Sequence, residues 1–279
     1  MVRSPMEKEQ SLREALTKMG SVVVAFSAGV DSTYLLKVAH DTLRDKAVAV
    51  TLRVSASPEE EVSEAIGFCE KEKIAHTIID IDQLQIEGFA ANPPDRCYLC
   101  KKVLFGKVLE YARSLGIPYV IDGSNADDTD DYRPGMRALK ELHIVSPLHD
   151  AGMTKDDIRK ASEALGLKTA SKPSLACLAT RFVYGETITK EKLERVFAAE
   201  KLLRDMGIRQ VRVRVHGEHG DLARIEIGKD EMTSFLNKET MQTVQEKLLE
   251  LGFLYVTLDL GGYETGSMNL SLKNPPNMN

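Results

Sequence analysis

The chain has 279 residues, of which 43% are hydrophobic and 28% are charged, and its formal net charge is −5. This length suffices for one large core or for two domains. The acidic balance argues against a protein whose main task is to grip nucleic acid, because that binding depends on neutralising phosphates. No apolar run is long enough to span a membrane and the N-terminus is polar, so we predict a cytoplasmic protein with no membrane partner.

An N-terminal amphipathic helix at residues 6–18 leads into an apolar strand at 22–26. Small and hydroxylated residues from Ser27 to Thr33 follow, and an apolar pattern of helical period then runs to about Leu43. Such a strand, tight loop and helix start expose backbone N–H groups at the positive end of the helix dipole. We predict a phosphate site here, with hydroxyl donors from Ser27, Ser32 and Thr33.

Strands and helices continue to alternate beyond this loop, which is typical of an α/β doubly wound parallel sheet. The pattern predicts further strands at 47–54, 76–81, 117–121 and, as a short fifth strand, 144–148. Ligands of such sheets bind at the carboxyl ends of the strands. Ser55, at the end of the second strand, is therefore expected to meet a bound adenosine.

An acidic loop at 122–131 follows the strand at 117–121, and would lie beside the phosphate loop if that strand neighbours the first one. Carboxylates next to phosphates repel them unless a cation intervenes. We predict Mg²⁺ on one or two members of this loop and the phosphate loop, with these candidates: Asp31, Asp127, Asp128 and Asp131. The alternative is a solvated acidic turn.

The composition shifts after a loop at 171–186, so we predict a first domain at 1–170 and a second, smaller α+β domain at 187–279. The tail beyond residue 260 is predicted to be mobile. The predicted elements of the second domain are helices at 189–206, 231–236 and 238–249 and strands at 211–216, 222–227 and 254–260.

The cysteines indicate metal or sulfur chemistry rather than disulfides. Cys97 and Cys100 are spaced C-x-x-C at a predicted helix start, Cys177 lies in a loop, and Cys69 falls on the apolar face of a helix and is predicted to be core. Three thiols make a poor closed zinc site but suit a 4Fe-4S cluster with one open iron. The alternative is a dithiol redox pair with a separate Cys177.

Arg212 and Arg214 lie two residues apart on a predicted strand and therefore share a face. Two adjacent guanidiniums favour a shared anion, commonly a phosphate. The alternative is a solvent-facing strand with salt bridges to Glu226 or Glu200.

The segment from Ser27 to Thr33 resembles the S-G-G-x-D-S signature of the PP-loop ATP pyrophosphatases, whose fold is HUP-like, with Ala28 in place of the first glycine. Because alanine tolerates a positive φ poorly, we interpret the family's glycine as a need for closeness rather than for a left-handed backbone. Asp122–Asn125, which contains Gly123, resembles the D-G-T-N segment of the same enzymes. The resemblance implies ATP bound through Ser27, Gly29, Asp31, Ser32, Thr33 and Gly123.

Further segments resemble the LarE sulfur transferases over nearly the whole chain. They are Asp131–Gly135, Cys177, Thr180–Gly185, Val211–Arg214 and Thr257–Gly262. The resemblance implies that a carboxylate of pyridinium-3,5-biscarboxylic acid mononucleotide is adenylated and then converted to a thiocarboxylate, in synthesis of the nickel-pincer nucleotide cofactor. It also implies a homo-oligomer, a hexamer in the family, and sulfide or a sulfur-donor system as a partner.

The resemblance assigns roles to residues of both domains. Arg212 and Arg214 would grip the ribose phosphate of the substrate, Arg181 would assist, and Glu200 would contact a metal or the substrate. In family members with one cysteine at the position of Cys177, that residue gives up its own sulfur. The additional Cys97 and Cys100 resemble the branch in which three cysteines hold a 4Fe-4S cluster, so we predict catalytic turnover.

Alternative functions come from different classes. A tRNA thiolation enzyme of the PP-loop, iron-sulfur type shares the cysteine pattern, but the acidic charge disfavours it. An ammonia-using synthetase that makes NAD or GMP has no use for three cysteines in loops. A nucleotide-binding regulator with a structural metal and no turnover is the third alternative.

Overall fold

The computed structural model describes residues 4–56, 59–129, 134–173 and 176–273, and the chain divides into two compact units. The first unit contains Met1–Asp82 and Cys97–Leu175, and the second contains Gln83–Arg96 and Ala176–Asn279. None of the helices described combines the length and the apolar character that crossing a membrane requires.

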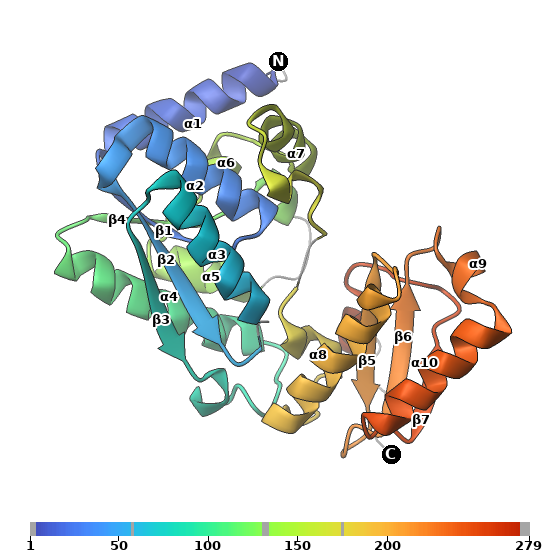
Figure 1. Ribbon diagram of the computed structural model, residues 1–279. Helices are drawn as coiled ribbons and strands as arrows, with labels where there is room; N and C mark the ends of the chain where they lie inside the picture. The colour runs from blue at the N-terminus through green and yellow to red at the C-terminus, as the bar shows by residue number, and fades with distance from the viewer. Residues whose placement is uncertain (1–3, 57–58, 130–133, 174–175, 274–279) are drawn as a thin grey trace. The chain divides into compact units, whose positions relative to one another are not determined.

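The first unit is built around a four-stranded sheet with the order β3-β2-β1-β4, in which every pairing is parallel (Figure 1). Its strands are β1 (Val22–Ala25), β2 (Ala47–Val54), β3 (His76–Ile81) and β4 (Tyr119–Ile121). Apolar β-branched residues on both faces of β1 suit a strand that is covered on both sides. The predicted α/β parallel sheet is thus confirmed.

Successive residues of β1 point to opposite faces and enter two separate cores. Val22 and Val24 pack in the core that α1, α2, α3 and α7 supply, and Val23 packs in the core that α4 and α5 supply. These helices are α1 (Pro5–Met19), α2 (Val30–Leu43), α3 (Glu59–Glu72), α4 (Arg96–Ser114), α5 (Pro134–Glu141) and α7 (Lys155–Ala164).

The predicted fifth strand at 144–148 is wrong. Only Val145 makes a parallel bridge, to Ile121, and the short helix α6 (Pro147–Asp150) begins two residues later. Pro147 lacks the N–H that a continued ladder needs and instead occupies the first helical position.

The second unit has a three-stranded sheet with the order β5-β6-β7. The hairpin of β5 (Val211–His216) and β6 (Leu222–Ile227) is antiparallel, whereas β7 (Tyr255–Leu258) pairs parallel to β6 after the intervening helices. Residues 211–216 alternate between apolar and polar, which is typical of a half-buried strand, yet five consecutive residues of β5 are buried. The helices of this unit are α8 (Lys190–Asp205), α9 (Met232–Phe235), α10 (Lys238–Glu250) and α11 (Leu270–Lys273).

Residues 83–96, which the sequence patterns assigned to the first domain, pack in the second unit. The fully buried Asn92 donates from Nδ2 to the carbonyl of Val183 at 2.6 Å, and its own carbonyl accepts the N–H of Gly185 at 2.9 Å. The buried Arg96 guanidinium donates to the carbonyl of Ala179 at 2.9 Å. These contacts are long-range in sequence, and nothing in the local pattern of residues 83–96 predicts them.

Candidate functional site

The predicted phosphate loop joins β1 to α2 at the carboxyl end of the sheet. The hydroxyls of Ser27 and Ser32 lie 3.1 Å apart, and the N–H of Ser27 donates to Oγ of Ser32 at 3.3 Å. Gly29 is the N-cap of α2 and supplies no side-chain hydrogen bond. The backbone N–H groups of the first turn therefore keep their capacity to bind an anion.

Ala28 corrects our interpretation of the phosphate loop. Its φ is +52°, so this position has the left-handed backbone that we expected the family's glycine not to require. The residue is 2% exposed, and its carbonyl accepts a hydrogen bond from Nζ of Lys172 at 3.1 Å. The surrounding contacts thus hold an alanine in a conformation that costs about 1–2 kcal/mol.

The segment after β4 lies against the phosphate loop, as predicted, because β4 pairs with β1. A Cβ added to Gly123 would lie 3.0 Å from the backbone nitrogen of Ser32, so glycine is needed for this close approach. Both carboxylate oxygens of Asp122 accept hydroxyl hydrogen bonds at 2.6 Å, from Ser124 and Ser146. Asp122 therefore fixes the segment.

Asp31 is the carboxylate of this region that best fits a metal ion. Its Oδ2 pairs with Nζ of Lys155, whereas its Oδ1 is buried and has no hydrogen-bond partner in the part of the chain that the structure describes. Burying a carboxylate oxygen without a hydrogen-bond partner costs free energy, and Mg²⁺ prefers carboxylate oxygens as ligands. Asp128 lines the same cavity, whereas Asp127 accepts the backbone N–H of Lys155 at 2.7 Å. Asp131 lies outside the described residues.

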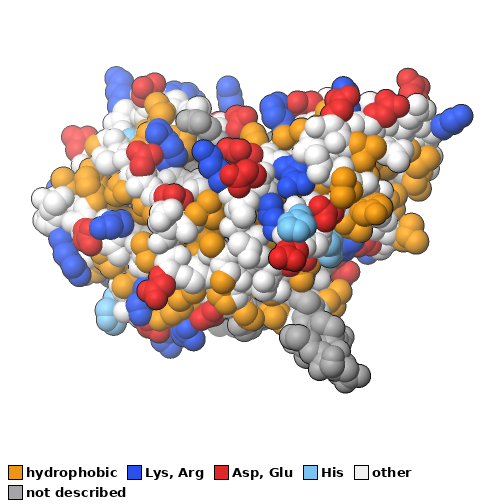
Figure 2. All heavy atoms as spheres, turned by 90° about the horizontal axis from the view of Figure 1, so that it is seen from below, with side chains coloured by type: hydrophobic (Ala, Val, Ile, Leu, Met, Phe, Trp, Pro, Cys, Tyr) orange, Lys and Arg blue, Asp and Glu red, His pale blue; other side chains and the backbone are white. Residues whose placement is uncertain are grey.

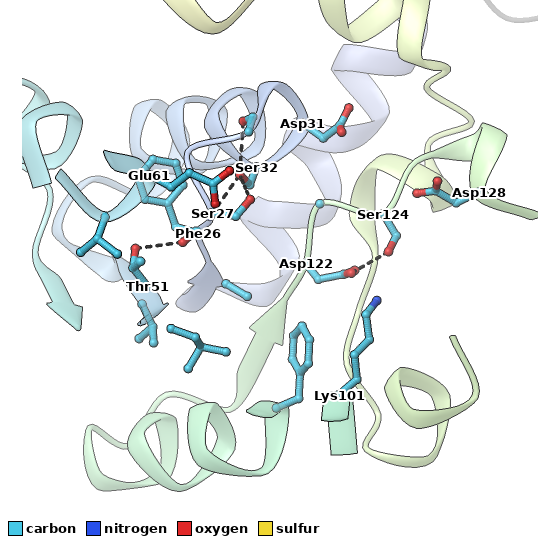
Figure 3. A pocket seen from close by; sticks show the side chains of 17 residues that line it. Phe26, Ser27, Asp31, Ser32, Thr51, Glu61, Lys101, Asp122, Ser124 and Asp128 are labelled. Atoms are coloured by element: carbon cyan, nitrogen blue, oxygen red, sulfur yellow. Dashed lines mark hydrogen bonds between the residues drawn. The ribbon is translucent and has the colours of Figure 1, made fainter. Parts of the chain in front are cut away.

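The loops enclose a cavity of about 340 Å³ that opens beside the phosphate loop (Figure 3). Polar residues from the phosphate loop and the Asp122 segment form one part of its wall, and apolar side chains form another part. The apolar lining consists of Ala25, Phe26, Val50, Leu52, Val62 and Phe105.

Two residues that were predicted to bind ATP do not line this cavity. The hydroxyl of Ser55 instead donates to Asp82 at 2.8 Å, and Thr33 is 1% exposed within the core. The role of Thr33 as a phosphate donor therefore stays a prediction, because its side chain does not line the cavity. Thr51, Glu61 and Lys101 line the cavity but were not predicted, since each lies in an element whose pattern only indicates strand or helix.

The four cysteines form no disulfide bonds with one another and lie in different environments. Cys97 and Cys100 lie in the first turn of α4, one half-buried and one 7% exposed, and their spacing puts them on one helix face. Cys69 is core, as predicted, and burial raises the pKa of its thiol to about 12. Among the described residues, no three or more His, Cys, Asp or Glu side chains are gathered as a metal site.

Cys177, in the second unit, presents an exposed residue on a fixed backbone. Its carbonyl accepts hydrogen bonds from the N–H and the hydroxyl of Thr180, at 2.9 and 2.8 Å, and from the Arg181 guanidinium at 3.3 Å. This loop therefore fixes the backbone of Cys177 and leaves the residue exposed.

Arg181 and Glu200 form an ion pair in the second unit in which each side chain is 1% exposed. Two hydrogen bonds join them, at 2.6 and 3.0 Å, and Glu200 also accepts the N–H of Val213 at 3.0 Å. Burial raises the pKa of Glu200, but Arg181, Arg212 and the N–H of Val213 together outweigh burial, so the pKa of Glu200 is lowered. Glu200 thus ties α8 to β5, and its oxygens are occupied by protein donors instead of facing a ligand.

Arg212 and Arg214 are both buried, so the alternative of a solvent-facing strand is wrong. The salt bridge to Glu226 that this alternative predicted is nevertheless present, at Arg214. Arg214 pairs with the fully buried Glu226 through two hydrogen bonds, at 2.9 and 2.6 Å. Arg212 stacks over Tyr263, with its guanidinium carbon 5.2 Å from the ring centre. Burial and the positive charge of Arg181 lower the pKa of Arg212, so a bound anion would be favourable here.

The chain is similar to several known proteins. The family model described as NAD synthase matches residues 6–92. A component of the glutamine-hydrolyzing GMP synthase of Thermoplasma volcanium is 27% identical, over 66% of this chain and 63% of its own length. An uncharacterized protein of Synechocystis is 41% identical over 94% of this chain and 97% of its own.

A fourth comparison covers almost the whole of both proteins. The pyridinium-3,5-bisthiocarboxylic acid mononucleotide synthase of Lactiplantibacillus plantarum is 38% identical over 266 residues, which are 95% of each chain. Identity at this level over both units extends well beyond the nucleotide-binding half. The chain therefore belongs to the family of this synthase, the LarE family of ATP-dependent sulfur transferases.

Proposed function

We propose that this enzyme adenylates a carboxylate of pyridinium-3,5-biscarboxylic acid mononucleotide and converts it to a thiocarboxylate, in synthesis of the nickel-pincer nucleotide cofactor. The observation that carries the proposal is the 38% identity to the Lactiplantibacillus plantarum synthase along 95% of both chains. The cavity beside the phosphate loop supports the proposal as a candidate nucleotide site.

ATP would bind with its adenosine against the apolar wall and its phosphates at the start of α2. The open N–H groups of the loop and the hydroxyls of Ser27 and Ser32 would hold the pyrophosphate. Mg²⁺ would be held by Oδ1 of Asp31 and by Asp128, and would neutralise charge on the phosphates.

In the first step, a substrate carboxylate oxygen attacks the α-phosphorus, the bond from that phosphorus to the bridging oxygen breaks, and pyrophosphate leaves. In the second step, the sulfur of a hydrosulfide attacks the acyl carbon, the acyl–oxygen bond breaks, and AMP leaves with the electron pair. The thiocarboxylic acid then loses a proton. Both steps balance with ATP, the carboxylate and hydrosulfide as reactants.

The arginine cluster of the second unit would hold the ribose phosphate of the substrate. Arg212 is the strongest candidate because burial and the positive charge of Arg181 lower its pKa, and a substrate phosphate would offset both effects. Arg214 and Arg181 are held by Glu226 and Glu200 and would add positive potential around that anion.

We further propose that Cys97, Cys100 and Cys177 ligate a 4Fe-4S cluster and that the enzyme turns over repeatedly. The proposal is supported by the kind and number of donors, which are two cysteines at the start of α4 and the exposed Cys177. When bound, such a cluster would supply an iron without a protein ligand that can carry the sulfur. The protein's part is to keep the three thiols reduced and oriented, and a dithiol redox pair is the alternative.

The function is tested by incubating anaerobically reconstituted protein with ATP, Mg²⁺, sulfide and the biscarboxylate mononucleotide. We expect pyrophosphate release that depends on the mononucleotide, and a product whose mass reflects exchange of oxygen for sulfur. A regulator without turnover would release no pyrophosphate. Iron and sulfide analysis of the same protein tests the cluster, and absence of both after reconstitution would disprove it.

A tRNA substrate is the second candidate, and the surface disfavours it. On the face in Figure 2, basic and acidic side chains are interspersed and do not form a basic stripe. The net charge of −5 adds to this argument. A tRNA gel shift that weakens with salt would favour this candidate over the mononucleotide.

We also propose a homo-oligomer, with contacts made by the second unit. β7 is an edge strand, and two large apolar residues at its start are well exposed, Leu254 at 64% and Tyr255 at 63%. Light scattering on the purified protein tests the assembly, and a monomer at all concentrations would contradict it.

A further inference from the structure

The cavity of the first unit is strongly acidic for a site that receives a triphosphate. Among the described residues that line it, four are carboxylates and a single one, Lys101, is a cation. The carboxylates are Asp31, Glu61, Asp122 and Asp128. One Mg²⁺ cannot offset the charge of ATP together with these side chains, so a protein cation in contact with the phosphates has a large electrostatic effect.

Lys101 is placed to supply that charge. It extends from α4 with its ammonium toward the part of the cavity where Asp122 and Ser124 lie (Figure 3). No ion pair joins its ammonium to another described residue. The other lysines near the phosphate loop are paired, Lys155 with Asp31 and Lys172 with Glu64.

Gly135 explains how Lys101 keeps this position. A Cβ added to Gly135 would lie 2.9 Å from Cδ and 3.2 Å from Cε of Lys101, and 3.6 Å from the carbonyl of Cys97. The lysine stem therefore runs across the backbone of α5 at a point that only glycine leaves open. A larger residue would displace the flexible stem and leave the helix in place, because the backbone contact is of ordinary length.

We propose that Lys101 contacts the phosphates of ATP and stabilises the charge that develops as pyrophosphate leaves, and that Gly135 is a positioning residue for it. The inference rests on the proposed function, because it assigns a role in that adenylation. It assigns a role to Gly135, the glycine of the Asp131–Gly135 motif, which is to leave room for the Lys101 side chain.

The test compares Lys101→Met, Lys101→Arg and Gly135→Ala with two controls on α4. Lys107→Met removes an exposed lysine that pairs with Glu110, and Gly106→Ala adds a methyl group with nothing within 4 Å. The readouts are the ATP dissociation constant from calorimetry, substrate-dependent exchange of pyrophosphate into ATP, and the thermal midpoint.

We expect Lys101→Met to weaken ATP binding about 10-fold and to slow exchange at saturating substrates about 100-fold. Lys101→Arg should retain part of the ATP affinity and part of the exchange rate. Gly135→Ala should weaken ATP binding and slow exchange by smaller factors than Lys101→Met, and the two controls should match the wild type. Wild-type ATP binding and exchange in Lys101→Met would overturn the role of Lys101, and unchanged ATP binding in Gly135→Ala would overturn the role of Gly135. If the wild type exchanges no pyrophosphate, the proposed function fails, while the ATP dissociation constants still decide whether Lys101 contacts the nucleotide.

Discussion

Charged side chains are used differently in the two units. In the first unit, neither Oδ1 of Asp31, which is buried, nor the ammonium of Lys101, which reaches into the cavity, is paired with another described residue. In the second unit, Arg181 and Glu200, and likewise Arg214 and Glu226, are buried and paired with each other. In our proposals ATP and its metal ion complete the first arrangement, whereas the second is largely complete before a ligand binds. We therefore expect charge removal to affect chemistry in the first unit and folding in the second.

The largest effect on stability is expected for Glu200→Gln. The substitution leaves the Arg181 guanidinium buried without its counter-charge, which should lower the free energy of unfolding by about 3–5 kcal/mol. Glu194→Gln, on the exposed side of the same helix, is the matched control and should change it by less than about 0.5 kcal/mol. Urea denaturation measures both, and equal stabilities would show that the pair is not structural.

Asp31→Asn should have a comparably large effect, but on activity. Loss of the charge on the proposed metal ligand should slow pyrophosphate release about 100- to 1000-fold. Stability should change by less than about 1 kcal/mol, because the pair with Lys155 is partly exposed. The control is Asp41→Asn on the same helix, because Asp41 forms its ion pair with Lys37. Normal activity of Asp31→Asn at limiting Mg²⁺ would exclude Asp31 as a ligand.

Arg212→Ala tests whether one buried arginine of the second unit binds the substrate, since we expect Arg212 to contact its phosphate. Loss of a charge-assisted contact to phosphate should raise KM for the mononucleotide about 10- to 100-fold and leave ATP binding unchanged. Arg209→Ala, an exposed neighbour, should behave as the wild type. A loss of ATP affinity in Arg212→Ala would contradict the division of the two sites.

The smallest effect is expected for Ala28→Gly. Glycine has no steric cost at a φ of +52°, so the substitution should raise the free energy of unfolding by about 1 kcal/mol. Thermal denaturation with and without ATP measures the change. A loss of stability would show that the methyl group packs well enough to outweigh the backbone conformation.

The sequence predicts the features that depend on local pattern and misses those that depend on distant contacts. The strand–loop–helix from Val22 onward is confirmed because each element has its own apolar period and the loop has its own small residues. The place of the Asp122 segment beside Ser32 is also confirmed, since strand order follows from the doubly wound pattern. Both features combine short-range signals with a general rule of topology.

Tertiary partners were not predictable in the same way. Residues 83–96 join the second unit through Asn92 and Arg96, whose partners lie about 90 residues away. The left-handed Ala28 was interpreted wrongly because contacts such as the one from Lys172 outweigh the intrinsic preference of alanine. The pairing of Arg214 with Glu226 was considered, but its burial depends on packing that the alternation of β5 does not reveal.

The most direct test of the central claim is the yield of thiocarboxylate per chain under anaerobic turnover, measured together with the intact mass of the protein. Our account predicts several products per chain with sulfide present and an unchanged mass, since Cys177 serves as a ligand and keeps its sulfur. A single product per chain, with loss of the mass of one H₂S at Cys177, would contradict it and show that the cysteine is sacrificed.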